Sequence, residues 1–380
     1  MENKSIPSTA DEWCDWHWQQ RNACRDEQSL SSALGGLGER LEKAIRNNLS
    51  SRKIQITPYY ISLMKKQKHI DWLDNPLFRQ VVPFWEDEPA GGFDGSSENW
   101  EMNHEMKTPI CQHKYDNRVI LRITNTCNSY CQFCFEALRT LQPNSSKENS
   151  KRSYFESSLD YIKSTPSIDE VILSGGDPLM LTDKKLDQVL RALRELRDDL
   201  LIRLHSRSLT FNPFRITDGL VSTFSESGLN AFGVHVCHPS ELTDDFLHAV
   251  RRLQQSVPLI FCNTPLLKGV NDNPEILRAL FLKLYRIGIK PYYLYHFMPF
   301  SPGAAVYKNS ISEAVDIMSQ LKRRVSNIAL PEYVLPHADG KFTVPLTGED
   351  CQFPHYEKRD DQLYYRFINW KGDVSEWLDN

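Results

Sequence analysis

Three of the nine cysteines in this 380-residue chain lie within eight positions, at Cys127, Cys131 and Cys134. The spacing C-x3-C-x2-C allows three thiolates on one short loop to converge on a single metal centre. Structural zinc usually has four ligands, and no fourth cysteine or histidine lies close in the sequence. Thiolates also hold iron–sulfur clusters, and three ligands would leave one iron open to a small molecule. We therefore predict an iron–sulfur cluster here, with structural zinc and three buried thiols as the alternatives.

Glycines and polar side chains follow three predicted strands downstream of these cysteines. In barrels, functional groups gather at the carboxyl ends of the strands. Glycines there let the backbone approach a ligand closely, and an aspartate can accept a hydrogen bond from an ammonium group. A structural role remains the alternative for each residue taken singly. The candidates are Gly175, Gly176, Asp177, His205, Ser206, Arg207, His235 and His238.

Six short runs of β-branched, aliphatic and aromatic residues predict the buried strands that position these groups. The runs are residues 118–124, 170–174, 200–205, 231–236, 257–262 and 289–296. After a longer first interval they start about every 30 residues, which is the length of one βα unit. Helical patterns lie between them, as at residues 186–196. Alternation of this kind predicts an α/β fold with a parallel sheet that curls into a barrel or partial barrel.

Two flanking regions complete the predicted domain organisation, which is 1–105 (helical), 106–305 (barrel) and 306–380 (C-terminal extension). The first has a helical pattern at residues 38–48, a turn before a short helix at Thr57-Pro58, and a loop composition at residues 86–99. The last has a helical pattern at residues 311–321, an extended stretch at 333–335 and a turn at 338–341.

Composition narrows the class of protein. The net charge is −4, so there is no basic excess to suggest nucleic acid or an anionic membrane as a partner. The apolar fraction of 40% and the charged fraction of 25% are ordinary for a globular protein. We find no secretory signal and no run as long as the roughly 18 apolar residues of a membrane span. A cytoplasmic location is therefore expected, where disulfides are rare.

The cysteine motif after the first strand of a βα barrel resembles the signature of radical S-adenosylmethionine (SAM) enzymes. The resemblance implies a partial (β/α)6 barrel of the TIM type, with a [4Fe–4S] cluster on Cys127, Cys131 and Cys134. In that family SAM chelates the fourth iron and is cleaved to a 5′-deoxyadenosyl radical. Residues 174–179 look like the family's Gly-Gly-Glu/Asp element, which binds the methionyl amino group of SAM.

A closer resemblance is to the lysine 2,3-aminomutase family, and it covers most of the chain. Five segments match that family in order, namely residues 15–19, 57–60, 78–83, 266–272 and 290–295. The resemblance implies pyridoxal 5′-phosphate (PLP) as a further cofactor, bound to a lysine after a glycine-rich turn. Here Lys341 is the counterpart and the predicted catalytic residue, although its turn is shorter and less glycine-rich than usual. Arg118 aligns with a cation that holds the PLP phosphate, and Lys114 replaces an arginine there.

Three departures put lysine in doubt as the substrate. Glu136 stands where the family usually has an arginine for the substrate carboxylate, so that Arg139 or another group must hold it. Met298 and Leu335 stand where lysine-specific members have two aspartates for the distal ammonium, which would be costly to bury without a partner. Phe300, like Met298, hints at an apolar pocket. The C-terminal region has only Cys351, so we predict no structural zinc.

These features predict a radical SAM, PLP-dependent 2,3-aminomutase, an isomerase that acts on an amino acid other than lysine. Radical decarboxylation, epimerisation or another rearrangement of a modified amino acid is the alternative, and a non-catalytic zinc-binding scaffold is a remote one. The expected partners are a small amino-acid substrate and an electron donor of the flavodoxin or ferredoxin type. The family resemblance also implies a homo-oligomer.

Overall fold

The computed structural model describes residues 9–68, 71–86, 101–141, 152–298, 303–337, 340–346, 355–360, 362–368 and 373–378. Four of the features discussed above lie outside these residues. They are the predicted loop at 86–99 except for residue 86, Phe300, the first two residues of the 338–341 turn, and Cys351.

A ten-stranded sheet forms the centre of the molecule, with its strands in sequence order from β1 to β10. Strands β3 to β9 are parallel, whereas β1, β2 and β3 form an antiparallel meander and β10 pairs antiparallel with β9. The strands are β1 (Met106–Thr108), β2 (Cys111–Tyr115), β3 (Arg118–Thr124), β4 (Glu170–Gly175), β5 (Leu201–Ser206), β6 (Ala231–His235), β7 (Leu259–Pro265), β8 (Lys290–Tyr295), β9 (Glu332–His337) and β10 (Gly340–Thr343). The fold is a partial barrel of the TIM type, as predicted.

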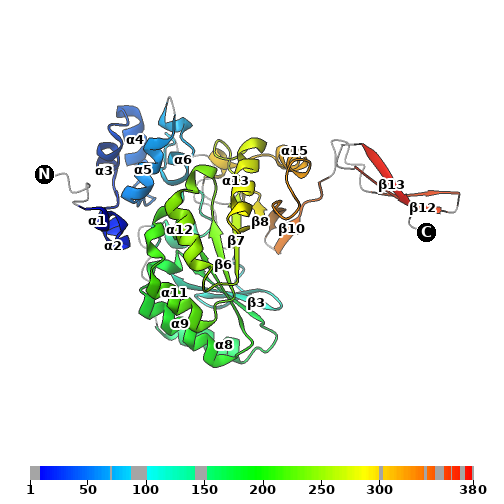
Figure 1. Ribbon diagram of the computed structural model, residues 1–380, viewed down its shortest axis with the longest axis horizontal. Coiled ribbons are helices and arrows are strands. Elements are labelled where there is room, and N and C mark those ends of the chain that lie inside the picture. Colours follow the sequence, from blue (N-terminus) through cyan, green and yellow to red (C-terminus); the bar gives the residue numbers. More distant parts are fainter. Residues whose placement is uncertain are drawn as a thin grey trace.

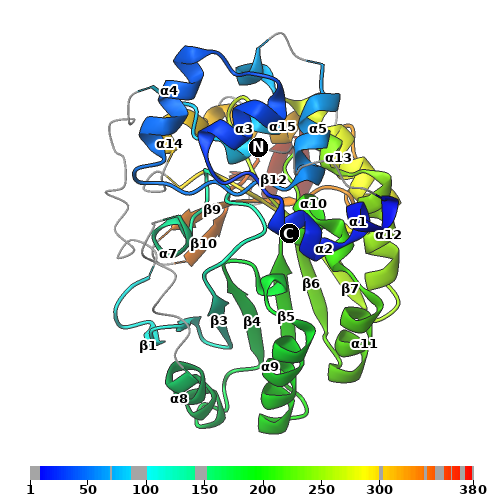
Figure 2. The ribbon, with the colours of Figure 1, turned by 90° about the vertical axis from the view of Figure 1, so that its left-hand side faces the viewer.

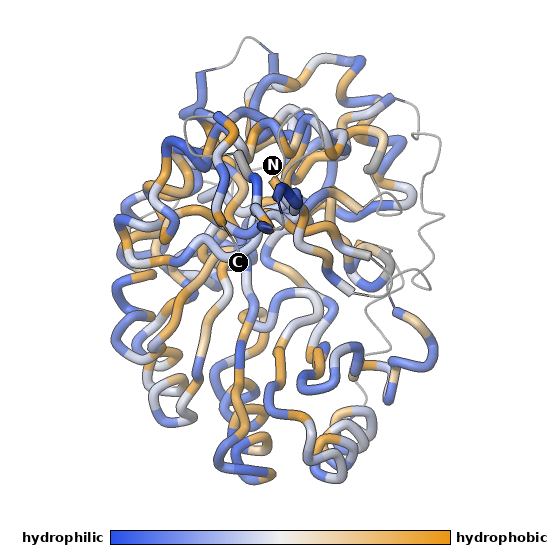
Figure 3. The backbone as a smooth tube through the Cα atoms, turned by 90° about the vertical axis from the view of Figure 1, so that its right-hand side faces the viewer, coloured by the Kyte–Doolittle hydropathy of each residue, from blue (hydrophilic) through white to orange (hydrophobic). Residues whose placement is uncertain are grey.

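Helices follow the strands of this sheet, and the longer ones pack against it (Figure 2). They are α7 (Ala137–Thr140), α8 (Arg152–Lys163), α9 (Asp183–Leu196), α10 (Ser208–Phe211), α11 (Asp218–Ser227), α12 (Asp244–Leu253), α13 (Pro274–Arg286), α14 (Ala304–Tyr307) and α15 (Ile311–Lys322). In α9, Leu186, Leu190 and Leu193 are completely buried, and each contributes about 1.5–3 kcal/mol by leaving water. Thr182 begins this helix by accepting a hydrogen bond from the Lys185 amide. Figure 3 shows hydrophobic residues running along the strands.

The N-terminal region is helical, as predicted, and has a hydrophobic core of its own that includes Ile45, Tyr60, Met64 and Phe78. Its helices are α1 (Ala10–Cys14), α2 (Trp16–Arg21), α3 (Glu27–Leu34), α4 (Glu39–Asn48), α5 (Pro58–Lys66) and α6 (Phe78–Val81). Thr57 caps α5 and also donates to the Phe211 carbonyl, which follows the end of β5. Figure 2 shows this region above one end of the sheet, and contacts of this kind identify that end as the carboxyl ends of the strands.

A second sheet near the C-terminus has three antiparallel strands. They are β11 (His355–Arg359), β12 (Gln362–Ile368) and β13 (Val374–Leu378). Figure 1 shows β12 and β13 standing apart from the barrel. Sequence patterns did not predict this sheet.

All six predicted strand runs form strands, and their starts differ from prediction by two residues at most. The predicted boundary at residue 305 falls before β9 and β10, although both strands belong to the ten-stranded sheet. The division of the chain into three domains stays a prediction. Within the described residues, no helix is both long and apolar enough to cross a bilayer.

Candidate active site

A cavity of ≈ 250 Å³ lies at the carboxyl ends of the barrel strands. All three motif cysteines line it, together with Lys341, so the structure brings the predicted metal ligands and the predicted catalytic lysine to one site. We call the side with Cys127, Cys131, Cys134 and Arg207 the cysteine end, and the side with Lys341, Tyr293 and Tyr295 the lysine end. Other residues lining the cavity include Gly175, Gly176, Asp177, Ser206, His235, Glu136, Met298, Arg203, His205 and Asn263.

The cysteine loop, residues 127–134, is held by the N-terminal region. Gln55 Nε2 donates to the Cys127 carbonyl at 3.0 Å. Gln132, which is completely buried, donates from Nε2 to the Lys53 carbonyl at 3.1 Å, and its backbone amide donates to the Gln80 carbonyl at 2.9 Å. The N-terminal region therefore contacts the loop at both Cys127 and Gln132.

The three thiols share one apolar environment. Burial raises the pKa of all three, and it raises that of Cys134 to about 12. Their mutual repulsion adds to this effect at Cys127 and Cys134. A cationic centre would reverse the preference, because metal ligation requires the thiolates and releases their protons. Among the described residues, no three histidine, cysteine or acidic side chains are close enough to ligate one ion. Three thiols that share a cavity are a donor set suited to a cluster.

Gly175 and Gly176 are required by a close approach of two backbone segments. A Cβ at Gly175 would lie 2.2 Å from the Thr124 carbonyl oxygen, and one at Gly176 would lie 2.4 Å from that of Thr126. Gly175 also has φ of +122°, which favours glycine. The Gly176 amide donates to the Thr124 carbonyl at 2.6 Å. The glycines thus join the end of β4 to the segment that leads into Cys127.

The Asp177 carboxylate is buried and fully bonded within the chain. One oxygen accepts from Ser206 Oγ at 2.8 Å and from the Leu179 amide at 3.0 Å. The other accepts from the Arg207 amide at 3.0 Å and from Ser208 Oγ at 2.9 Å. The carboxylate therefore anchors the loops after β4 and β5. Contact of Asp177 and Ser206 with SAM stays a prediction.

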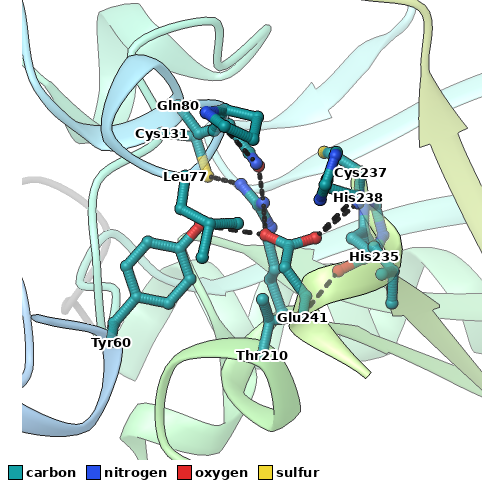
Figure 4. Close-up of polar contacts among 12 residues, drawn as sticks. Tyr60, Leu77, Gln80, Cys131, Thr210, His235, Cys237, His238 and Glu241 are labelled. Atoms are coloured by element: carbon teal, nitrogen blue, oxygen red, sulfur yellow. Dashed lines mark hydrogen bonds and ion pairs between the residues drawn. The ribbon is translucent and has the colours of Figure 1, made fainter. Parts of the chain in front are cut away.

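The Arg207 guanidinium lies against the cysteine loop. Its Nη1 donates to Cys131 Sγ at 2.7 Å, and its Nη2 donates to Glu241 Oε1 at 2.9 Å and to Gln80 Oε1. Its Nε is buried without a partner in the described chain. Figure 4 shows Cys131, Gln80 and Glu241 around this position. The N–H of Nε and the second N–H of Nη1 are left to serve the predicted contact with SAM.

His235 forms a hydrogen-bonded pair with His205 on the cavity wall, with His205 Nδ1 and His235 Nε2 3.1 Å apart. Burial lowers the pKa of His235 to about 4 and holds that of His205 well below its usual value. Both rings are therefore neutral near pH 7, and their tautomers are complementary. Contact of His235 with a cofactor stays a prediction.

At the lysine end, Lys341 Nζ lies 4.9 Å from the ring centroid of Tyr293 and 5.3 Å from that of Tyr295. Although Lys341 as a whole is exposed, its side chain lines the cavity, where loss of hydration lowers its pKa to about 8, and Arg203 and Arg118 act in the same direction. The Lys341 backbone amide donates to Tyr115 Oη at 3.1 Å. About half of the amine is therefore neutral near pH 8, and a nucleophilic lysine reacts in this neutral form.

The two predicted phosphate ligands lie apart from the cavity lining. Lys114 forms a buried ion pair with Glu105, with Nζ and Oε1 2.6 Å apart. Arg118 stacks on the Tyr115 ring at 4.1 Å, and it is close enough to lower the pKa of Lys341. Their predicted role in phosphate binding stays a prediction, and the geometry favours Arg118 over Lys114.

Glu136 is part of a buried group of two glutamates and two arginines. Its Oε1 accepts from Arg122 Nε at 2.8 Å, and its Oε2 lies 3.8 Å from Arg139 Nε. Glu101 accepts from Arg139 through both of its oxygens, each at 2.7 Å, and it lies 3.1 Å from Arg122 Nη2. Glu136 lines the cavity, whereas Arg139 is not among the described residues that do. The negative charge of Glu136 is therefore balanced by Arg122 and Arg139, which are not among the described residues that line the cavity.

Two residues at the site were missed by sequence reasoning, namely Arg122, which pairs with Glu136, and Arg203, which lines the cavity. Arg122 lies two residues after Ile120, which lines the cavity from β3, so the period of a strand could have placed it on the cavity side. Arg203 lines the cavity from β5 and pairs with Glu170 at 3.1 Å, and its Nε is buried without a partner in the described chain. No local pattern in the sequence singles out Arg203, because residues 200–205 as a whole predict a buried strand.

The chain is similar to known proteins over most of its length. The Radical SAM superfamily model matches residues 121–280. The chain is 32% identical to the L-lysine 2,3-aminomutase of Methanococcus maripaludis, over 98% of this chain and 83% of that one. It is 32% identical to the L-lysine 2,3-aminomutase of Escherichia coli, over 84% of this chain and 90% of that one. The solved coproporphyrinogen III oxidase of E. coli, a radical SAM enzyme, aligns with 55% of this chain at 14% identity and a TM-score of 0.36.

Proposed function

Because this chain belongs to the L-lysine 2,3-aminomutase family of radical SAM enzymes, we propose that it is a 2,3-aminomutase for an amino acid other than lysine. The family makes it an isomerase and implies a [4Fe–4S] cluster and SAM, and its relatives suggest PLP. When bound, the cluster and SAM supply a radical that abstracts hydrogen, and PLP carries the amino group that migrates.

The observation that carries this proposal is the state of the acidic groups in the cavity. Among the described lining residues, the only carboxylates are Asp177 and Glu136. Asp177 accepts four hydrogen bonds from the chain, and Glu136 is paired with Arg122 at 2.8 Å. A second ammonium group, such as the one at the distal end of lysine, would therefore find no free carboxylate here. Burying it without a partner is costly.

The distal part of the substrate is expected to be apolar. Met298 lines the cavity and is buried, and Phe297 beside it is also buried. Methionine adapts its shape to irregular apolar groups. Because Glu136 is already paired with Arg122 at 2.8 Å, it offers no free carboxylate to a charged side chain of the substrate.

Within this proposal, each residue of the lysine end has a definite task. Lys341 supplies the amine that binds the PLP aldehyde, and the rings of Tyr293 and Tyr295 limit the motion of its Nζ. Arg203 offers a buried N–H to an anionic group of the cofactor or the substrate. The Cys127, Cys131 and Cys134 thiolates would hold the cluster at the opposite end of the same cavity, so that one substrate can reach both groups.

An amino-acid panel tests the proposal. The purified enzyme is incubated without oxygen with SAM, PLP, a reductant and single amino acids, and the products are analysed by chromatography and mass spectrometry. We expect an isomer of unchanged mass from an amino acid with an apolar side chain, and little turnover of lysine. Lysine as the best substrate would overturn the proposal. A product of lower mass would indicate decarboxylation or another outcome instead.

We also propose a small electron-transfer protein of the flavodoxin or ferredoxin type as the reductant, a homo-oligomeric state and a cytoplasmic location. The support is chemical, because an oxygen-sensitive cluster needs a reducing compartment and an external electron. Cluster reduction by flavodoxin in place of dithionite tests the first of these. Light scattering tests the second, with a monomeric mass as the contradicting result.

A further inference from the structure

The Arg207 guanidinium is largely buried and lies beside two aromatic rings and a cysteine. Its carbon lies 4.6 Å from the Phe211 ring centroid and 5.3 Å from that of Phe133. Its Nη1 donates to Cys131 Sγ at 2.7 Å. Nearby aromatic rings attract a cation, and exclusion of water strengthens its remaining contacts. The contact with sulfur is therefore a charge-assisted hydrogen bond in a dry site.

Glu241 fixes the orientation of this guanidinium. It is completely buried, and its Oε1 accepts from Arg207 Nη2 at 2.9 Å and from Tyr60 Oη at 2.9 Å. Its Oε2 accepts from the backbone amides of Cys237 and His238, at 2.7 and 3.0 Å. Both oxygens are thus satisfied, and the carboxylate cannot turn without losing buried hydrogen bonds. Figure 4 shows Tyr60, Cys237 and His238 arranged around Glu241.

Gln80 connects the same guanidinium to the cysteine loop by a second route. Its side-chain oxygen accepts from Arg207 Nη2, and its Nε2 donates to the Pro76 carbonyl at 2.9 Å. Its own carbonyl accepts from the Gln132 amide at 2.9 Å, between Cys131 and Cys134. The N-terminal region therefore holds both the loop and the cation that touches it.

We propose that Arg207 is a positioning residue for the metal centre, which orients Cys131 and raises the reduction potential of the cluster, with Glu241 and Gln80 holding it in place. This inference rests on the [4Fe–4S] cluster of the proposed function. Hydrogen bonds to ligand sulfurs and nearby charge are the levers by which a protein sets cluster potentials. A fixed cation beside Cys131 stabilises the electron-rich reduced form, so its removal lowers the potential.

The test compares four variants of the full-length protein after reconstitution with iron and sulfide under anaerobic conditions. Arg207→Met removes the charge and the donors, and Arg207→Lys keeps the charge alone. The double variant Arg207→Met/Glu241→Gln avoids an unpaired buried carboxylate and is measured in case Arg207→Met does not fold. Arg215→Met is the matched control, because Arg215 is also completely buried and paired with an acid, Asp183, but donates to backbone carbonyls rather than to a cysteine. Iron content and the midpoint potential, followed by EPR, are measured without substrate.

We expect Arg207→Met and the double variant to bind the cluster about 10- to 100-fold more weakly, the usual range for loss of an outer-shell partner, or to show a more negative midpoint potential. Arg207→Lys should fall between these variants and the wild type, and Arg215→Met should match the wild type. An unchanged potential with full iron content in both Arg207→Met proteins would overturn the inference, as would equal iron loss in Arg215→Met. A wild-type protein that binds no cluster would instead overturn the cofactor assignment itself.

Discussion

The cysteine end of the cavity is held by buried polar contacts from the N-terminal region and from the segments that follow β4, β5 and β6, whereas the lysine end rests on β8 and β10, which flank β9 at one edge of the sheet. Arg207 and Asp177 at the first end make hydrogen bonds at nearly every polar atom. Lys341 at the second is held by its backbone and by tyrosine rings. The difference suggests that the cysteine end is rigid, as a metal centre of fixed geometry requires. The lysine end is accessible, as an amine that must exchange its bonding partner requires.

The largest effect should come from the cysteine ligands themselves. Replacing Cys127, Cys131 or Cys134 with alanine should remove most of the iron and reduce SAM cleavage to background, because a cluster with two protein ligands is poorly held. Cys14→Ala is the control, since Cys14 is an exposed thiol on α1. Iron analysis and the release of 5′-deoxyadenosine check both. Normal iron in any one of the three variants would exclude that cysteine as a ligand.

Lys341→Ala should leave the cysteine end intact and disable the lysine end. We expect substrate turnover to fall by about 10²- to 10⁴-fold, the range for loss of a positioned group that transfers protons, with unchanged iron. Borohydride reduction and peptide mapping should find a pyridoxyl group on Lys341 in the wild type alone. A label on another lysine would contradict the assignment of Lys341 as the residue that binds PLP.

Gly176→Ala tests whether the backbone junction of β4 supports the cysteine loop. Its Cβ would lie 2.4 Å from the Thr126 carbonyl oxygen, so the segment before Cys127 must shift. We expect lower iron content, and little change in PLP labelling at Lys341. Gly219→Ala is the control, because the nearest atom to its Cβ is the far end of a side chain, at 3.1 Å. Equal iron in the two variants would show that the junction is tolerant.

Glu136→Gln should destabilise the protein by about 1.5–3 kcal/mol, the usual contribution of a hydrogen bond to a charged group, because it weakens the charge balance around buried Arg122. Glu101 remains as a second partner at 3.1 Å, which limits the loss. Glu156→Gln removes an exposed ion pair with Arg152 and should change stability by less than about 0.5 kcal/mol. Urea denaturation measures both, and equal effects would show that the buried group carries no special weight.

The smallest effect is a displaced pH dependence at the lysine end. The neutral amine of Lys341 reacts with the PLP aldehyde, and its pKa is lowered to about 8 by loss of hydration. The rate of PLP attachment should therefore rise with pH up to about 8 and level off above it. An ordinary lysine, with a pKa of about 10.4, would show a rate that still rises at pH 9. That result would place Lys341 in ordinary solvent.

The sequence alone predicts the candidate residues better than the partners that hold them. The cysteine loop and the strands that precede each candidate residue depend on local patterns, so β3 was predicted with its bounds and Cys127, Cys131 and Cys134 meet at one cavity. The partners of these residues come from distant segments. No local pattern indicates that Arg207 contacts Cys131 or that Glu105 neutralises Lys114, because burial and charge pairing are settled only when the chain folds.

Glu136 illustrates how a correct local observation still lacked its partner. The sequence identified an acid in an unusual position and suggested repulsion of a substrate carboxylate. In the structure, Arg122 from the preceding strand pairs with this acid at 2.8 Å. A strand period of two places Arg122 on the side of Ile120, and that signal was present in the sequence. The C-terminal sheet of β11 to β13 was not predicted, because β11 and β13 have only five residues each and mix aromatic with charged side chains.

Hydrogen transfer from substrate to SAM tests the central claim that both ends of one cavity act on one amino acid. The substrate is the amino acid identified by the panel, labelled with deuterium at its β-carbon. It is added to reduced enzyme loaded with SAM and PLP, and the 5′-deoxyadenosine formed is analysed by mass spectrometry. We predict deuterium in the 5′-deoxyadenosine of the wild type and none above background with Lys341→Ala, although that variant keeps its iron. Unlabelled 5′-deoxyadenosine from the wild type, or equal labelling in both proteins, would contradict the account.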